Sequence, residues 1–161
     1  MTTPRPAHEA ALAAASSPDW ATRARAGHEL ARWADDPRTA DALIQLLLDQ
    51  HDTVVTDETS RALLERQDTH GLRLVAHAVA LADEQALDHL WDTVEEHALI
   101  DTSATAFIAL CRQLRQDPEP AVRAGTRALL DRIKPYSTAS DRHPDNPSSS
   151  RRGRPSTGID P

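Results

Sequence analysis

The sequence predicts an all-α fold, a short solenoid of stacked antiparallel helix pairs with about seven or eight helices. Helix-start signals follow one another closely, and no segment alternates polar and apolar residues with a period of two. Only 5 of the 161 residues are glycine, too few for a fold built on many tight turns. Aromatic residues make up 3% of the chain, so we expect alanine, leucine and valine to fill the core of a single domain.

The clearest helix starts are a serine or an aspartate directly before a proline, at Ser17, Asp36 and Asp117. The side-chain oxygen of such a residue accepts a hydrogen bond from the first turn, where proline is tolerated because its missing N–H is not needed. Asp101 is the predicted cap of another helix. With apolar residues at helical spacing, the predicted helices cover about residues 7–15, 17–34, 37–47, 53–67, 69–82, 84–97, 101–115 and 118–133.

The composition changes after residue 133. Residues 134–161 contain repeated proline, serine, glycine and arginine and almost no large apolar side chain. Such a segment cannot bury enough apolar surface to offset the entropy lost on ordering. We therefore expect a disordered tail at 134–161, a helical repeat domain at 17–133 and a capping helix within residues 1–16.

An internal repeat of about 33 residues accompanies the helices. Residues 21–23 (Ala-Thr-Arg) align with residues 54–56 (Val-Val-Thr) and with residues 121–123 (Ala-Val-Arg), and a leucine follows each triplet at the same distance. The middle residues of the triplets are 33 and 67 positions apart, and a unit around Leu90 fills the longer interval. One helix pair has too little apolar surface to be stable alone, so we expect the units to stack.

Two segments carry a resemblance to a known family. Residues 117–123 read Asp-Pro-Glu-Pro-Ala-Val-Arg, and residues 35–43 read Asp-Asp-Pro-Arg-Thr-Ala-Asp-Ala-Leu. They resemble the acidic-proline turn and the inter-helix turn of the HEAT-repeat family, and Arg23 and Arg123 match its first-helix arginine, which is missing at Thr56. The resemblance covers about residues 17–133 and implies a small, curved HEAT-repeat protein of the kind found in bacteria.

The charge and the cysteine content limit the possible partners. The chain has a formal net charge of −7, with −9 in residues 1–133 and +2 in residues 134–161, which argues against a general nucleic-acid or membrane-surface binder. One cysteine excludes an internal disulfide, and no run approaches the roughly 20 apolar residues of a membrane span. A secretory leader is not recognisable. We expect a cytoplasmic monomer.

The predicted function is a non-catalytic protein–protein interaction module, either an adaptor, a regulatory subunit or a toxin-neutralising protein. The second helices of stacked pairs line a concave face, where arginines could bind an acidic peptide through paired hydrogen bonds. The acidic body would equally suit a basic partner. Trp33 is the predicted exposed aromatic contact, and Trp20 and Trp91 are predicted core residues. The predicted partner-binding residues are Arg38, Asp41, Gln45, Arg73, His77, Arg112 and Arg115.

Two other function classes stay open, a metal-dependent or lyase-type enzyme of the HEAT-repeat group and a nucleic-acid-binding HEAT-like protein. His89, Asp92 and Glu96 have the spacing of convergent metal ligands on a helix, although a solvated acidic face has the same pattern. The pairs at residues 8–9 and 28–29 (His-Glu) resemble those of HEAT-repeat di-iron hydroxylases, but two pairs cannot supply the four that this activity implies. We expect His8 to be exposed and His28 to pack near a helix seam.

Nucleic-acid binding of the kind found in HEAT-like alkylpurine glycosylases implies a basic groove with aromatic walls, which an acidic chain does not favour. Cys111 falls in an apolar stripe and is predicted to fill the core rather than to act as a nucleophile. We therefore expect no catalytic residue, no metal and no cofactor.

Overall fold

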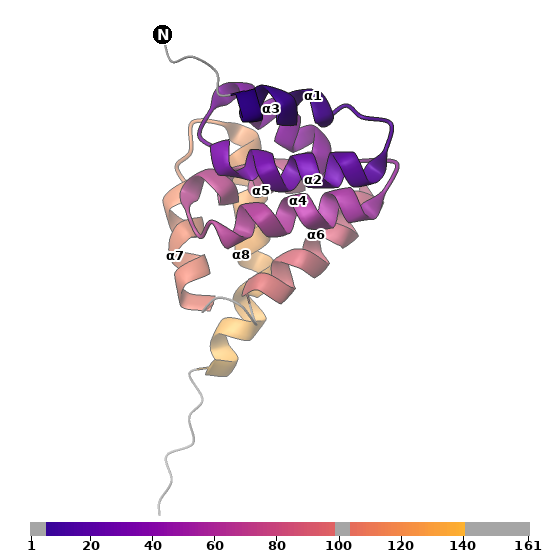
Figure 1. The fold of residues 1–161 in the computed structure, drawn as a ribbon. Helices are drawn as coiled ribbons and strands as arrows, with labels where there is room; N and C mark the ends of the chain where they lie inside the picture. The colour runs from indigo at the N-terminus through magenta and orange to yellow at the C-terminus, as the bar shows by residue number, and fades with distance from the viewer. Residues whose placement is uncertain (1–5, 99–103, 141–161) are drawn as a thin grey trace, which may run out of the picture.

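The computed structural model describes residues 6–98 and 104–140, with side chains described through Lys134. Every regular element in these ranges is a helix, which confirms the all-α prediction. Figure 1 shows their arrangement. The elements are α1 (Pro6–Ala14), α2 (Trp20–Leu30), the 3₁₀ turn η1 (Ala31–Trp33), α3 (Pro37–Leu47), α4 (Thr53–Glu65), α5 (Thr69–Leu81), α6 (Glu84–Glu96), α7 (Ala104–Leu114) and α8 (Pro120–Ser140).

Aspartates cap the N-termini of five helices, α2 to α6. Each accepts a hydrogen bond on its side chain from a backbone N–H of the first turn, at 2.8–3.0 Å. The helix expected to begin at Ser17 is instead capped by Asp19, because the carboxylate of Asp19 reaches Thr22 N, and it ends in the separate turn η1. The cap predicted at Asp101 lies outside the described residues. The five capping residues are Asp19, Asp36, Asp52, Asp68 and Asp83.

The helices lie in two layers. Helices α2, α4 and α6 pack side by side, and α3, α5 and α7 pack beside one another behind them (Figure 1). These neighbour relations are those expected of stacked helix pairs. Helix α8 departs from that order, because its largest contact is with α5 and its next largest with α7. The solenoid therefore stays a prediction, whereas the helical content is established.

Helix α8 approaches α5 closely at Gly125. A Cβ atom added there would lie 1.7 Å from the carbonyl oxygen of Ala76. Only glycine permits this approach, and it brings Val122, Leu129 and Ile133 of α8 into full burial. The inward stripe of α8 is thereby fixed.

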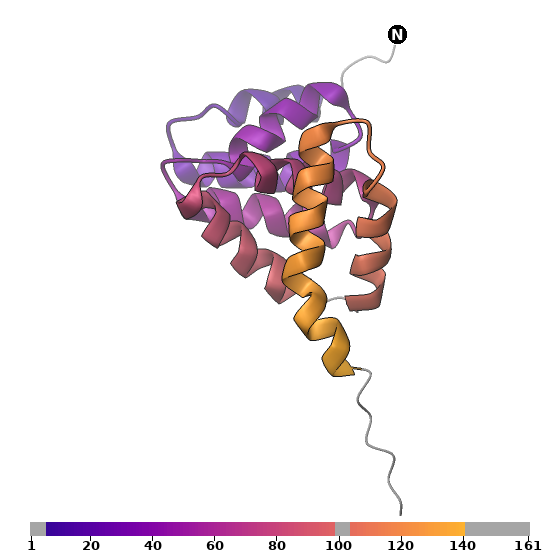
Figure 2. The same cartoon turned by 180° about the vertical axis from the view of Figure 1, so that it is seen from behind.

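The C-terminal boundary differs from the sequence prediction. Helix α8 continues past Lys134 and through Pro135 to Ser140, so residues 134–140 are helical rather than part of a tail. Proline at position 135 removes one helical N–H donor, and Figure 2 shows the last turns of α8 bending away from its axis. Residues 141–161, the rest of the predicted tail, lie outside the described residues.

One continuous apolar core joins the helices, and its fully buried members are mainly leucine and valine, as the composition predicts. Leu47 is fully buried, whereas Ile108 lies half-buried at the edge of the core. Trp20 was expected in the core. It is the first residue of α2, and its side chain is 47% exposed. None of the described helices is both long and apolar enough to cross a membrane.

The Gly125 contact can be tested by Gly125→Ala. Helix propensity alone predicts that this change stabilises the protein by about 1 kcal/mol. The clash with the Ala76 carbonyl predicts the opposite sign, a loss of about 1–3 kcal/mol in the free energy of unfolding measured by urea titration. Ala124→Gly, at an exposed position of the same helix, is the matched control and should lose only about 1 kcal/mol. Stabilisation by Gly125→Ala would contradict the close packing of α5 and α8.

The helix faces can be tested by comparing two truncations. Leu47→Ala should lower the free energy of unfolding by about 2–4 kcal/mol, because it leaves a cavity in the closed core. Ile108→Ala should cost less than half as much, since the half-buried site already meets solvent. Equal losses would show that Ile108 is as fully packed as Leu47.

Candidate partner-binding surface

Six of the seven predicted partner-binding residues lie on α3, α5 and α7, the layer of second helices, and Arg115 lies in the turn directly after α7. The structure does not gather them into one surface. Asp41, Arg73 and His77 line one hollow between α3 and α5, whereas Arg112 and Arg115 line a separate groove between α7 and α8. Gln45 borders a third hollow near the turn before α4. Arg38 is exposed and pairs with Glu9 of α1 at 2.8 Å.

Two of these residues are used inside the fold. Arg73 binds both carboxylate oxygens of Asp117 at 2.8 and 3.1 Å and one oxygen of Glu119 at 3.1 Å. His77 Nε2 lies 3.4 Å from the other oxygen of Glu119. This network ties α5 to the turn before α8. The Arg73 hydrogen bond, ahead of the opposing effect of burial, holds the pKa of the Asp117 carboxyl below its usual value.

The groove between α7 and α8 is strongly basic. It has a volume of about 400 Å³ and an apolar floor made by Ile108 and Leu130. Figure 2 shows the two helices side by side. Among the described residues no carboxylate pairs with the four arginines of the groove, and its one acid, Asp131, pairs with Lys134 at 2.6 Å. The cations of this α7–α8 groove are Arg112, Arg115, Arg123, Arg127 and Lys134.

Three of these cations were missed as site residues. Arg123 was predicted only as a match to the first-helix arginine of the HEAT-repeat family, and Arg127 and Lys134 were not predicted as site residues. Their positions in the sequence could have indicated a shared face. Arg123, Arg127, Leu130 and Lys134 follow one another at intervals of three to four residues, which places them on one stripe of α8. What the sequence did not show was that α7 would lie beside this stripe.

The arginines at the starts of α2 and α8 make the same local contact. Nη1 of Arg23 donates to the carbonyl oxygens of Ser17 and Pro18 at 2.9 and 3.1 Å. Nη1 of Arg123 donates to the carbonyl oxygens of Asp117 and Pro118 at 2.7 and 2.9 Å. Each guanidinium thus binds the turn that precedes its own helix, which agrees with the repeat seen in the sequence.

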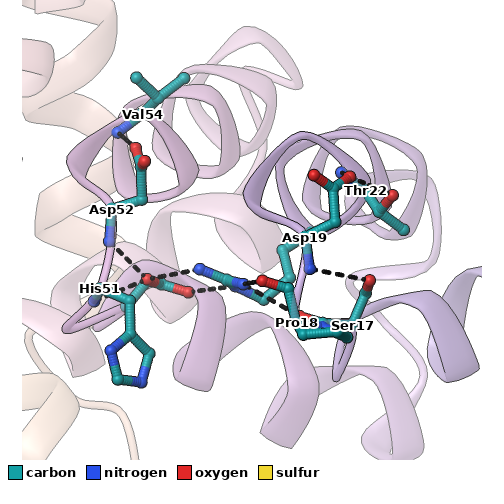
Figure 3. Close-up of polar contacts among 9 residues, drawn as sticks. Ser17, Pro18, Asp19, Thr22, His51, Asp52 and Val54 are labelled. Carbon is teal, nitrogen blue, oxygen red and sulfur yellow. Dashed lines mark hydrogen bonds and ion pairs between the residues drawn. The ribbon is translucent and has the colours of Figure 1, made fainter.

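Arg23 also binds Asp49, an acid in the turn between α3 and α4. Figure 3 draws the polar contacts around this turn, with His51 and Asp52 labelled on one side and Ser17 and Pro18 on the other. Nε and Nη2 of Arg23 donate to the two oxygens of Asp49 at 2.7 and 3.2 Å, and the two side chains are only 9% and 6% exposed. The backbone N–H groups of His51 and Asp52 donate to the same carboxylate, each at 2.9 Å. Burial alone would raise the pKa of Asp49, but these hydrogen bonds outweigh it and hold the pKa below its usual value.

The candidate metal ligands do not converge. His89 is half-buried and Asp92 exposed on α6, and Glu96 lies 3.7 Å from Arg61. Among residues 6–98 and 104–134, no group of three histidine, cysteine, aspartate or glutamate side chains could hold a metal ion. The His-Glu pairs at residues 8–9 and 28–29 lie within these ranges and are therefore not part of any such group.

Besides Trp20, three more predictions about ring side chains were wrong, those for His8, His28 and Trp33. His8 is buried and forms a hydrogen bond with Thr39 Oγ1 of α3 at 2.6 Å, whereas His28 is exposed. Trp33 is half-buried rather than exposed, because its ring stacks on His8 with centroids 4.7 Å apart. Trp91 is half-buried against the core, with the guanidinium of Arg132 5.7 Å from its ring centroid.

Cys111 is fully buried, as expected of a core residue. Burial raises the pKa of its thiol to about 12, so almost none of it is thiolate at neutral pH.

Comparison with protein-family models, with curated proteins and with solved structures found no match to this chain. The resemblance to HEAT repeats therefore rests on the residues of this chain.

The buried pair of Arg23 and Asp49 predicts how stability depends on pH. A carboxyl with a lowered pKa in the folded state stabilises the protein above its unfolded pKa, near 3.8, and loses that contribution as the pH falls toward the folded value. Asp49→Asn should lower the free energy of unfolding at neutral pH by about 3 kcal/mol, because it leaves a buried guanidinium without its charge partner. Its loss of stability below pH 3.8 should be smaller than that of the wild type.

Denaturant unfolding at neutral and acid pH measures both effects. Asp35→Asn removes an exposed carboxylate and is the control, which should change stability by less than about 0.5 kcal/mol. Identical acid dependence in the wild type and in Asp49→Asn would show that this pair does not contribute to acid unfolding.

Proposed function

We propose that this protein is a non-catalytic protein-binding module that binds an acidic segment of a partner protein in the α7–α8 groove. The observation that carries the proposal is a groove, in a chain with net charge −7, that gathers four arginines with no carboxylate partner among the described residues. Arginine binds carboxylates through paired hydrogen bonds, and a groove with several arginines favours an occupant with several carboxylates. The apolar floor adds surface that such a segment could cover.

The distribution of the other arginines supports this choice of surface. Arg23, Arg66 and Arg73 are bound to aspartates within the fold, and Arg38, Arg61 and Arg132 pair with glutamates. Of the predicted binding residues, Arg112 and Arg115 thus retain unpaired guanidinium groups, whereas Arg38 and Arg73 have partners within the described chain. The proposed binding surface is thus the groove between α7 and α8, whereas the sequence predicted a row of residues along α3, α5 and α7.

The family and the cellular location of the protein are also proposals. We infer a divergent, small HEAT-repeat protein of the bacterial kind from residues 35–43 and 117–123, and the matching contacts of Arg23 and Arg123 support it. A single cysteine fits a cytoplasmic location. The raised pKa of the Cys111 thiol fits a role in packing rather than in catalysis.

A charge-reversal experiment tests the groove. The probe is a fluorescent oligoglutamate peptide, and binding is followed by fluorescence anisotropy at low and near-physiological salt. Arg112→Glu combined with Arg127→Glu should weaken binding about tenfold or more, because both cations face the groove. Arg25→Glu combined with Arg32→Glu changes the net charge equally at exposed sites near α2 and should weaken binding less than about threefold.

Equal losses in the two double variants would mean that the net charge, and not the groove, controls binding. A short DNA duplex serves as a second probe. If it bound the groove more tightly than oligoglutamate at matched salt, the protein would be a nucleic-acid binder and the proposal would fail.

A further inference from the structure

Helices α2 and α8 can be compared position by position, because Arg23 and Arg123 bind their preceding turns in the same way. In α2 and the turn after it, Gly27, Ala31 and Ala34 are buried small residues. Thr59 of α4 packs against Gly27, and Arg66 donates to the carbonyl oxygen of Ala31 at 2.8 Å. This face of α2 is therefore the one covered by the next helix pair.

The corresponding face of α8 carries charges. Arg127, Asp131 and Lys134 stand where α2 has Gly27, Ala31 and Ala34, and all three are exposed. Together with Arg123 and Leu130 they form the α8 side of the α7–α8 groove. Within the described part of the chain, no helix covers this groove, which is thus the counterpart of the surface that α4 covers on α2.

At this surface Arg123 lacks the acid that Arg23 holds. Nε and Nη2 of Arg23 are occupied by Asp49, whereas in the described part of the chain no hydrogen bond or ion pair uses Nε or Nη2 of Arg123. The carbonyl oxygens of Asp117 and Pro118 fix the direction of the Arg123 guanidinium through Nη1. A planar guanidinium held at one edge presents its other donors in a fixed fork.

We propose that the α7–α8 groove docks a helix–helix turn of a partner protein and that Arg123 binds an aspartate of that turn as Arg23 binds Asp49. This inference rests on the function proposed above and names the part of the partner that is recognised. The turn before α4 shows the chemistry of the ligand. The carboxylate of Asp49 accepts two hydrogen bonds from its own turn as well as two from the arginine, so it reaches the guanidinium already oriented.

The same comparison limits how the partner docks. Gly27 lets α4 approach α2 closely, since a Cβ atom at that position would lie 2.0 Å from Thr59 Oγ1. Arg127 in the corresponding place keeps a partner backbone farther from α8. The turn itself therefore docks at Arg123, and a helix cannot stack on α8 as closely as α4 stacks on α2.

Two occupants from this chain fit less well. Residues 134–161 carry a formal charge of +2 and do not complement a basic groove. In a second copy, the residue ahead of α2 that corresponds to Asp49 ahead of α4 is Ser16, which has no carboxylate. The charges favour a different protein whose turn is acidic.

The experiment uses the full chain and a synthetic peptide of residues 46–58, which contains the Asp49 turn. Asp49→Asn and scrambled versions of the peptide are the controls. In NMR titrations, the Nε–H signal of Arg123 should shift with the native peptide, and the Nε–H signal of Arg23 should not. The wild type should bind the native peptide about fivefold or more tightly than the Asn peptide. The ratio of the two affinities, native peptide to Asn peptide, should approach one in the Arg123→Lys variant and should stay as in the wild type in the Arg127→Lys variant.

The outcomes separate this inference from the proposed function. If oligoglutamate binds the groove but the three peptides bind equally, or if Arg127→Lys abolishes the ratio as Arg123→Lys does, the groove binds acidic segments without recognising a turn, and the inference fails alone. If oligoglutamate does not bind, both fail. The NMR signal of the wild type decides the question even if Arg123→Lys does not fold.

Discussion

At Gly125 the backbone of α8 lies against the carbonyl oxygen of Ala76 in α5, with no room for a side chain between the helices. This contact fixes the rotation of α8 about its axis. Val122, Leu129 and Ile133 turn into the core, and the neighbouring stripe of Arg123, Arg127, Leu130 and Lys134 turns toward α7. Had α8 packed beside α6 as the next member of that layer, these cations would not face α7. The basic groove is thus a consequence of one helix crossing.

Arg23 and the arginines of the α7–α8 groove have different physical roles. A buried guanidinium needs a carboxylate, because desolvation without a partner is costly, and Arg23 satisfies this need with Asp49. The exposed guanidinium groups of the α7–α8 groove are hydrated and need no internal partner. Their mutual repulsion is weak in water but lasts as long as the groove is empty. An acidic occupant would relieve that repulsion, which gives the groove a charge preference before any specific contact forms.

The sequence predicted the features that depend on neighbouring residues. The helix starts at Asp36 and near Asp117, the apolar stripe with Cys111 and the matching roles of Arg23 and Arg123 all follow from spacings within a few residues. Features set by distant residues were not predicted. Arg73 was assigned to a partner, but its acid lies 44 positions away at Asp117.

The errors in the aromatic and tail predictions have different origins. Trp33 was placed at the surface because it ends a helix, yet the ring of His8, which the chain brings back from α1, covers it. The helix at residues 134–140 continues because one proline removes a single backbone donor, which need not end a helix. A composition rich in proline and serine therefore placed the end of the last helix too early.

The burial of Cys111 gives the protein an internal reporter of its own motions. Because the sequence has one cysteine, any reaction of a thiol reagent with the native protein must occur at α7, and only after that helix has opened. Burial raises the thiol pKa to about 12, so the closed form holds almost no reactive thiolate. At a reagent concentration where labelling of the opened form is slower than helix closure, the observed rate is proportional to the equilibrium population of the opened form. Labelling kinetics would thus measure the local stability of one wall of the α7–α8 groove without any engineered probe.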